Sequence, residues 1–147
     1  MASVGIEAMI KPMFFGDIED YPVSYKPSDK PQVYITCNEG REEEYGIPQV
    51  LEKAKELKEF TFHIYGINGT NTDNVIYHGW TDKMDEETKS FQAVIRLNKH
   101  DGFSQTVMKG ILMGQHVIRD LNELQFLKNK EQNNDREELI YELDRRN

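Results

Sequence analysis

The amino-acid sequence predicts a single Rossmann-like α/β domain, in which a parallel sheet of about five to six strands carries helices on both faces. Two observations lead to this fold class. Short runs of β-branched and aromatic residues alternate with segments of helical apolar spacing, and the alternation repeats about every 25 residues, as in strand–helix–strand units. The chain has 147 residues, which is enough for one domain with a hydrophobic core.

The chain is expected to begin with a linker-like lead-in over residues 1–30, followed by the domain over residues 31–147. The prolines Pro12, Pro22 and Pro27 exclude a long helix from the lead-in. Aromatic residues lie between these prolines, so we expect the segment to pack on the domain.

The first strand, loop and helix are expected between residues 32 and 58. Residues 32–36 (QVYIT) predict a buried strand through their β-branched and aromatic side chains. Residues 37–46 are polar and predict a loop, with Glu42–Glu44 as a solvated face. Residues 47–58 predict an amphipathic helix, because their apolar residues recur at helical spacing.

The remaining elements continue the alternation to the end of the chain. Strands are expected at residues 60–65, 74–78, 93–97 and 115–118. Helices are expected at residues 82–91, 104–114, 121–130 and 135–146. The first turn of the 82–91 segment is rich in acidic residues, which the helix dipole favours, and Ser104 is a good N-cap.

Composition excludes several classes of function. The net charge is −8, with 26 acidic and 18 basic residues, so nucleic acid is not an expected partner. No run of about 18 apolar residues occurs, so no transmembrane segment is expected. The single cysteine, Cys37, cannot form an internal disulfide, which favours a cytoplasmic location. The four histidines lack the spacing of metal ligands, so no metal site is expected.

Polar loops are expected at the carboxyl ends of four strands, where parallel sheets bind ligands. These loops cover residues 37–46, 66–73, 78–81 and 98–103, and three of them contain glycine at the strand exit. Their convergence predicts a ligand crevice, although glycine and asparagine also form ordinary turns.

The loop before the 104–114 segment gives the strongest signal. Gly102 would let a phosphate approach the backbone, and the N–H groups that follow lie at the positive end of a helix. His100 could donate a hydrogen bond to a phosphate or to a sugar hydroxyl. An ordinary strand-to-helix turn with an exposed His100 explains the same residues equally well.

An ordered set of motifs between residues 63 and 118 resembles the C-terminal, nucleotide-sugar-binding domain of retaining GT-B glycosyltransferases of the group 1 type. The motifs are HIYGING, VIYHGW, AVIRLNKHDGFS and MGQHVI, in that order along the chain. The short helix expected at residues 135–146 also fits the closing helix of such domains. The resemblance implies a Rossmann-like fold and glycosyl transfer, with a separate domain or chain that binds the acceptor.

The resemblance also implies roles for individual residues. A nucleotide-diphosphate sugar would be the substrate, without a cofactor. Asp101 would contact the transferred sugar and Arg41 would stabilise the diphosphate, as the catalytic pair. The donor-binding residues would be Asn38, Gly40, Gly66, His78, Gly79, His100, Gly102, Phe103, Ser104, Gln105 and Lys109.

Departures from the family pattern support an alternative function. Lys109 stands where the family carries a second acid, Tyr45 stands near the usual lysine, and the neighbouring glutamates would repel a diphosphate. A catalytically inactive Rossmann-like module for protein association would explain these differences. A flavodoxin-like or receiver-like domain fits less well, because residues 38–41 lack both an acid cluster and a Ser/Thr-rich phosphate loop.

Overall fold

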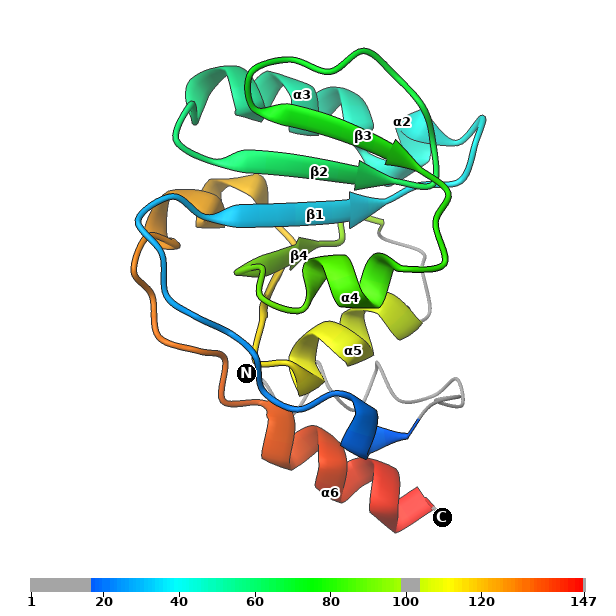
Figure 1. The fold of residues 1–147 in the computed structure, drawn as a ribbon, viewed down its shortest axis with the longest axis vertical. Coiled ribbons are helices and arrows are strands. Elements are labelled where there is room, and N and C mark those ends of the chain that lie inside the picture. Colours follow the sequence, from blue (N-terminus) through cyan, green and yellow to red (C-terminus); the bar gives the residue numbers. More distant parts are fainter. Residues whose placement is uncertain (1–16, 99–103, 147) are drawn as a thin grey trace.

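The computed structural model describes residues 17–98 and 104–146, and the structural statements refer to these residues. Five strands form one parallel sheet with helices around it (Figure 1), which confirms the predicted fold class. The strands are β1 (Gln32–Thr36), β2 (Thr61–Tyr65), β3 (Val75–Gly79), β4 (Ala93–Ile95) and β5 (His116–Ile118). The helices are η1 (Ile18–Asp20), α2 (Glu42–Tyr45), α3 (Ile47–Glu56), α4 (Met84–Thr88), α5 (Gln105–Leu112), η2 (Leu121–Phe126) and α6 (Arg136–Arg146).

The strand order is β3-β2-β1-β4-β5, so the chain reverses its direction across the sheet beside the central strand β1. Val33 of β1 is the register partner of Phe62 on one side and of Ala93 on the other. The carboxyl ends of β1 and β4 therefore lie next to each other. Ligands of open parallel sheets bind at such a reversal point.

Helices cover both faces of the sheet, as predicted. Val33 and Ile35 of β1 belong to a core that includes α3 and η2. Tyr34, which points to the opposite face, belongs to a second core that includes α5 and α6. Figure 1 shows α6 beyond α5. Leu139 and Leu143 of α6 belong to this second core. Burial on both faces explains why the strands are almost continuously apolar.

The polar segment after β1 contains a short helix, α2, where the sequence predicted only a loop. Its first turn consists of Glu42, Glu43 and Glu44, whose charges suit a helix N-terminus. Gly46 follows with φ +81°, a left-handed conformation that lets α3 begin directly after α2. The acidic run therefore stabilises local structure.

Three other predicted elements differ from the structure. The helix expected at residues 82–91 is only the five-residue α4, Met84–Thr88. The helix expected at residues 121–130 is a 3₁₀ helix that ends at Phe126, begun by a capping box between Asp120 and Glu123. The strand expected at residues 93–97 ends at Ile95, although the N–H of Arg96 still donates to Ile118 O at 2.8 Å.

The segment before β1 packs against the turn between α5 and β5. The backbone N–H groups of Ser24 and Tyr25 donate to Met113 O at 3.1 and 3.2 Å. Tyr25 is buried, and its ring makes an edge contact with His116. Across the described parts of the chain, no helix has the length and apolar character needed to span a membrane.

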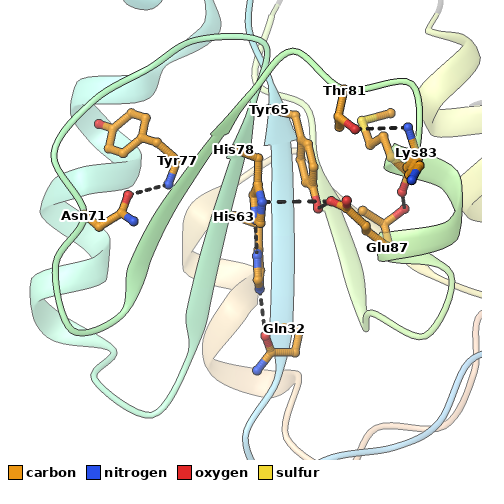
Figure 2. Close-up of polar contacts among 11 residues, drawn as sticks. Gln32, His63, Tyr65, Asn71, Tyr77, His78, Thr81, Lys83 and Glu87 are labelled. Atoms are coloured by element: carbon orange, nitrogen blue, oxygen red, sulfur yellow. Dashed lines mark hydrogen bonds and ion pairs between the residues drawn. The ribbon is translucent and has the colours of Figure 1, made fainter.

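The outer edge of β3 is covered by the loop that precedes it. The side-chain oxygen of Asn71 accepts a hydrogen bond from the N–H of Tyr77 at 2.8 Å (Figure 2). The N–H of Thr72 donates to Val75 O at 3.0 Å. The loop thus satisfies backbone groups that an edge strand would otherwise expose.

Candidate ligand site at the carboxyl edge of the sheet

A cavity of about 200 Å³ lies where β1, β2 and β3 end. Its walls include Asn38, Gly66 and Gly79, three of the residues that the sequence assigned to donor binding. Trp80 and Met84 complete the wall on the side of α4. The structure therefore brings together the exits of three of the four strands whose loops were predicted to converge.

Glycine is required where these exits meet. Gly66 has φ +99°, and a Cβ built on it would overlap the carbonyl oxygen of Cys37. Gly79 has φ +67°, and a Cβ there would lie 2.7 Å from Asn68 Oδ1. Gly40 also has a positive φ, +83°, but its Cβ position is open. Gly66 and Gly79 thus allow a close approach, whereas Gly40 serves only its turn.

Trp80 presents a large aromatic surface at the rim of this cavity. Its side chain directly follows β3 and is 81% exposed. An exposed indole beside a cavity can stack on a planar base or on the apolar face of a sugar. The structure places Trp80 at the rim of the cavity.

His78 belongs to a partly buried chain of hydrogen bonds on the sheet, shown in Figure 2. His78 Nε2 lies 2.8 Å from His63 Nδ1, and His63 Nε2 lies 2.7 Å from Gln32 Oε1. The ring of Tyr65 stacks on His78 at 4.4 Å, and its hydroxyl donates to Glu87 Oε1 at 3.0 Å. The imidazole of His78, which the sequence assigned to donor binding, is therefore hydrogen-bonded and stacked within the protein.

The partners of His63 define its tautomer. Because the Gln32 oxygen accepts, Nε2 of His63 carries the proton and Nδ1 accepts from His78 Nε2–H. Burial and the neighbouring His78 lower the pKa of His63 to about 4. His63 is accordingly neutral near neutral pH, and its ring stacks on Phe91 at 4.5 Å.

The loops after β1 and β4 meet at the ring of Tyr45. Asn38 Nδ2 donates to the Tyr45 hydroxyl at 3.2 Å. The guanidinium carbons of Arg41 and Arg96 lie 6.0 and 5.3 Å from the ring centroid. Arg41 also donates from Nε to Glu44 Oε2 at 2.6 Å, and this hydrogen bond raises its pKa. The cation that the sequence assigned to the diphosphate is thus engaged by a carboxylate of its own loop.

Ser104 caps α5, as predicted. Its Oγ accepts from the N–H groups of Thr106 and Val107 at 3.1 and 3.4 Å. Gln105 is the first residue of the helix. The remaining candidates of this loop, His100, Asp101, Gly102 and Phe103, lie outside the described residues.

Lys109 joins three elements on the side of the sheet that α5 covers. Its ammonium group lies 3.1 Å from Asp85 Oδ2, and the hydroxyl of Tyr21 donates to the same oxygen at 3.0 Å. Burial alone would lower the pKa of Lys109, but the hydrogen bond and charge of Asp85 outweigh burial and raise it. Sequence reasoning missed both partners, because Tyr21 belongs to the lead-in and Asp85 to α4.

A larger cavity, of about 610 Å³, lies at the ends of β4 and β5. Its lining includes Asn98 and Arg119, which the sequence analysis did not single out. The sequence signal that could have identified this site is an arginine directly after each of the two neighbouring strands. No group of three or more metal-binding side chains occurs within residues 17–98 and 104–146.

The fold is shared with solved structures that include a sugar transferase. One is the pneumococcal O-GlcNAc transferase GtfA in complex with UDP and GlcNAc, with a TM-score of 0.51 and 20% identity over 66% of this chain and 22% of that chain. Another is a mutant of S. aureus TarM in complex with Fondaparinux, alpha-GlcNAc-glycerol and UDP, with a TM-score of 0.55 and 15% identity over 88% of this chain and 30% of that chain. The GtfA/B complex matches with a TM-score of 0.50 and 13% identity, over 85% of this chain and 30% of that chain.

These likenesses establish the fold alone, since identity is low. The chain spans less than a third of the length of these structures. No protein-family model matches the sequence, and no curated protein does.

Proposed function

We propose that the chain is a nucleotide-sugar-binding domain of the glycosyltransferase type, corresponding to the C-terminal domain of a retaining GT-B enzyme. The observation that carries the proposal is the parallel sheet that reverses beside β1, in a fold shared with sugar transferases. The GtfA and TarM structures contain UDP. A uridine nucleotide is therefore the first ligand to consider.

The donor would bind along the carboxyl edge. The cavity at Asn38, Gly66 and Gly79 can accept one ring of the donor, and Trp80 offers a stacking surface beside it. The phosphates would lie toward the ends of β1 and β4, where arginines gather around Tyr45. The transferred sugar would contact Asp101, as the resemblance implies.

The chemistry of such a domain is stabilisation of a leaving diphosphate. As the bond between sugar and phosphate breaks, negative charge develops on the departing phosphate, and preorganised N–H groups and guanidiniums stabilise it. The acceptor would be held by another domain or chain, as the resemblance implies; this chain covers 22 to 30% of the solved structures named above.

Trp80 provides a direct test because it is the only tryptophan of the chain. UDP, GDP and ADP, with their sugar conjugates, would be titrated at millimolar concentration against intrinsic fluorescence and thermal unfolding. At tenfold the Kd, binding should raise the Tm by about 3 to 5 °C. GlcNAc alone serves as the control ligand. Neither a fluorescence change nor a Tm shift with any nucleotide would contradict the proposal.

A catalytically inactive association module is the second candidate. Two cations of the expected donor set are engaged by carboxylates of this chain, Arg41 by Glu44 and Lys109 by Asp85. Sedimentation velocity would distinguish the two functions. A stable oligomer that binds no nucleotide would favour the association module. A monomer that binds one of the nucleotides would favour the nucleotide-sugar-binding domain.

A further inference from the structure

Two arginines directly follow neighbouring strands at the carboxyl edge of the sheet. Arg96 follows β4 and Arg119 follows β5, and the last residues of these strands, Ile95 and Ile118, are register partners. Like charges at paired positions of a sheet repel each other. Burial lowers the pKa of the half-buried Arg96, and the charge of Arg119 acts in the same direction. The fold thus places two cations together where one of them is partly desolvated.

Packing positions Arg96 through Tyr45. The guanidinium carbon of Arg96 lies 5.3 Å from the ring centroid, within the range of a cation–π contact. Tyr45 ends α2, and a Cβ built on the next residue, Gly46, would lie 2.7 Å from Leu97 Cδ1. The turn between α2 and α3 is therefore held against the exit of β4. The ring of Tyr45 is thus held in place, and it positions the guanidinium of Arg96.

The cavity of about 610 Å³ beside this edge has room for a ligand. Arg119 and Asn98 line it, and Oδ1 of Asn98 is buried without a hydrogen-bond partner among the described residues. Glu43, Glu44 and Asp120 also line it, but Glu44 is bonded to the arginine of its own loop and Asp120 caps η2. Two of the three carboxylates on its wall already have partners.

We propose that Arg96 and Arg119 bind the phosphate groups of the ligand, and that Tyr45 is the residue that positions Arg96. Guanidiniums offer planar pairs of donors that match phosphate oxygens, and an anion between the two arginines would offset their repulsion. The identity of the ligand as a nucleoside diphosphate rests on the proposed function, whereas the anion site rests on the arginines themselves. Arg41, the sequence-based candidate, is exposed and bonded to Glu44.

Isothermal titration with inorganic pyrophosphate, UDP, GDP and ADP at low salt tests the proposal. The variants are Arg96→Gln and Arg119→Gln, with Lys55→Gln as the control. Lys55 is an exposed cation of α3 paired with Glu52, so its loss changes the net charge equally, away from the edge. Each arginine variant should weaken pyrophosphate binding about tenfold or more, and Lys55→Gln less than about twofold. Circular dichroism would confirm that each variant is folded.

Two results would overturn the anion site. One is a wild-type chain that does not bind pyrophosphate at millimolar concentration. The other is an equal affinity in the wild type and both arginine variants. Failure of the proposed function looks different: pyrophosphate would bind through Arg96 and Arg119 while no nucleotide binds more tightly. Conversely, a nucleotide that binds equally well to the wild type and to all variants would support the proposed function and contradict the role of the two arginines.

The role of Tyr45 has its own readout. Tyr45→Phe keeps the ring beneath Arg96 and should retain pyrophosphate affinity, whereas Tyr45→Leu should lose several-fold. In the NMR spectrum, the ring-current shift of the Arg96 Nε–H signal should persist in Tyr45→Phe and vanish in Tyr45→Leu. Loss of affinity in Tyr45→Leu with an unchanged Arg96 signal would contradict a positioning role.

Discussion

Acidification should destabilise this fold through His63. The side chain is only 7% exposed, and it lies between Gln32, His78 and the ring of Phe91. Its pKa of about 4 lies below the ordinary value of 6.5 because burial and His78 disfavour the imidazolium. Below pH 6.5 the unfolded chain therefore binds a proton that the folded chain resists.

The sign and size of the effect of pH on stability follow from the difference between these two pKa values. Stability rises with pH wherever the unfolded state binds more protons, so the contribution of His63 is lost progressively as the pH falls from about 6.5 to about 4. The gap between the two pKa values corresponds to about 3 kcal/mol in the free energy of unfolding. His78 and Glu87 face the same cluster, and His78 lowers the pKa of His63 in the same direction as burial does.

Urea unfolding at pH 7 and at pH 4, on the wild type and on His63→Gln, measures this contribution. Other carboxylates titrate in both proteins, so the difference between the two profiles isolates His63. The wild type should lose about 3 kcal/mol more than the variant over this range. Parallel profiles, or an NMR titration giving His63 a pKa above 6, would refute the reasoning.

Two further predictions concern the strand exits and α5. Gly66→Ala should destabilise by more than about 2 kcal/mol in urea unfolding, since a left-handed backbone alone costs about 1 to 2 kcal/mol and the methyl group would also strike Cys37 O. Gly40→Ala is the matched control, with a positive φ but open space, and equal losses would contradict the close approach. Lys109→Glu should destabilise more than Lys109→Gln, by about 1 kcal/mol, because the new carboxylate would face Asp85. An equal Tm for the two Lys109 variants would show that the pair is not formed in solution.

The sheet could be predicted from the sequence because its strands are buried on both faces. Such strands read as continuous apolar runs, so β1, β2 and β5 lie within a residue or so of their expected positions. The acidic segment was interpreted as a solvated loop, because three successive glutamates have no apolar periodicity. Its helix depends on Gly46, whose left-handed conformation cannot be distinguished in sequence from that of any turn glycine.

The candidate site was predictable only in part. Parallel topology places the strand exits at one edge, so the meeting of Asn38, Gly66 and Gly79 follows from the fold class. The fold class does not predict which residues the charged side chains contact. The Lys109–Asp85 contact joins residues from different helices, and the His63–His78 bond depends on the register of β2 with β3. Such pairings are tertiary, and local sequence carries no sign of them.

The loop that covers the outer edge of β3 has a consequence for solubility. A bare edge strand is a template on which another chain can add, and the risk grows in mild acid, where the net charge of −8 is titrated away and mutual repulsion between molecules falls. Asn71 and Thr72 occupy the backbone groups on which such growth would start. Shortening this loop to make a more compact protein would therefore leave a fold with the same core and a greater tendency to form intermolecular sheets.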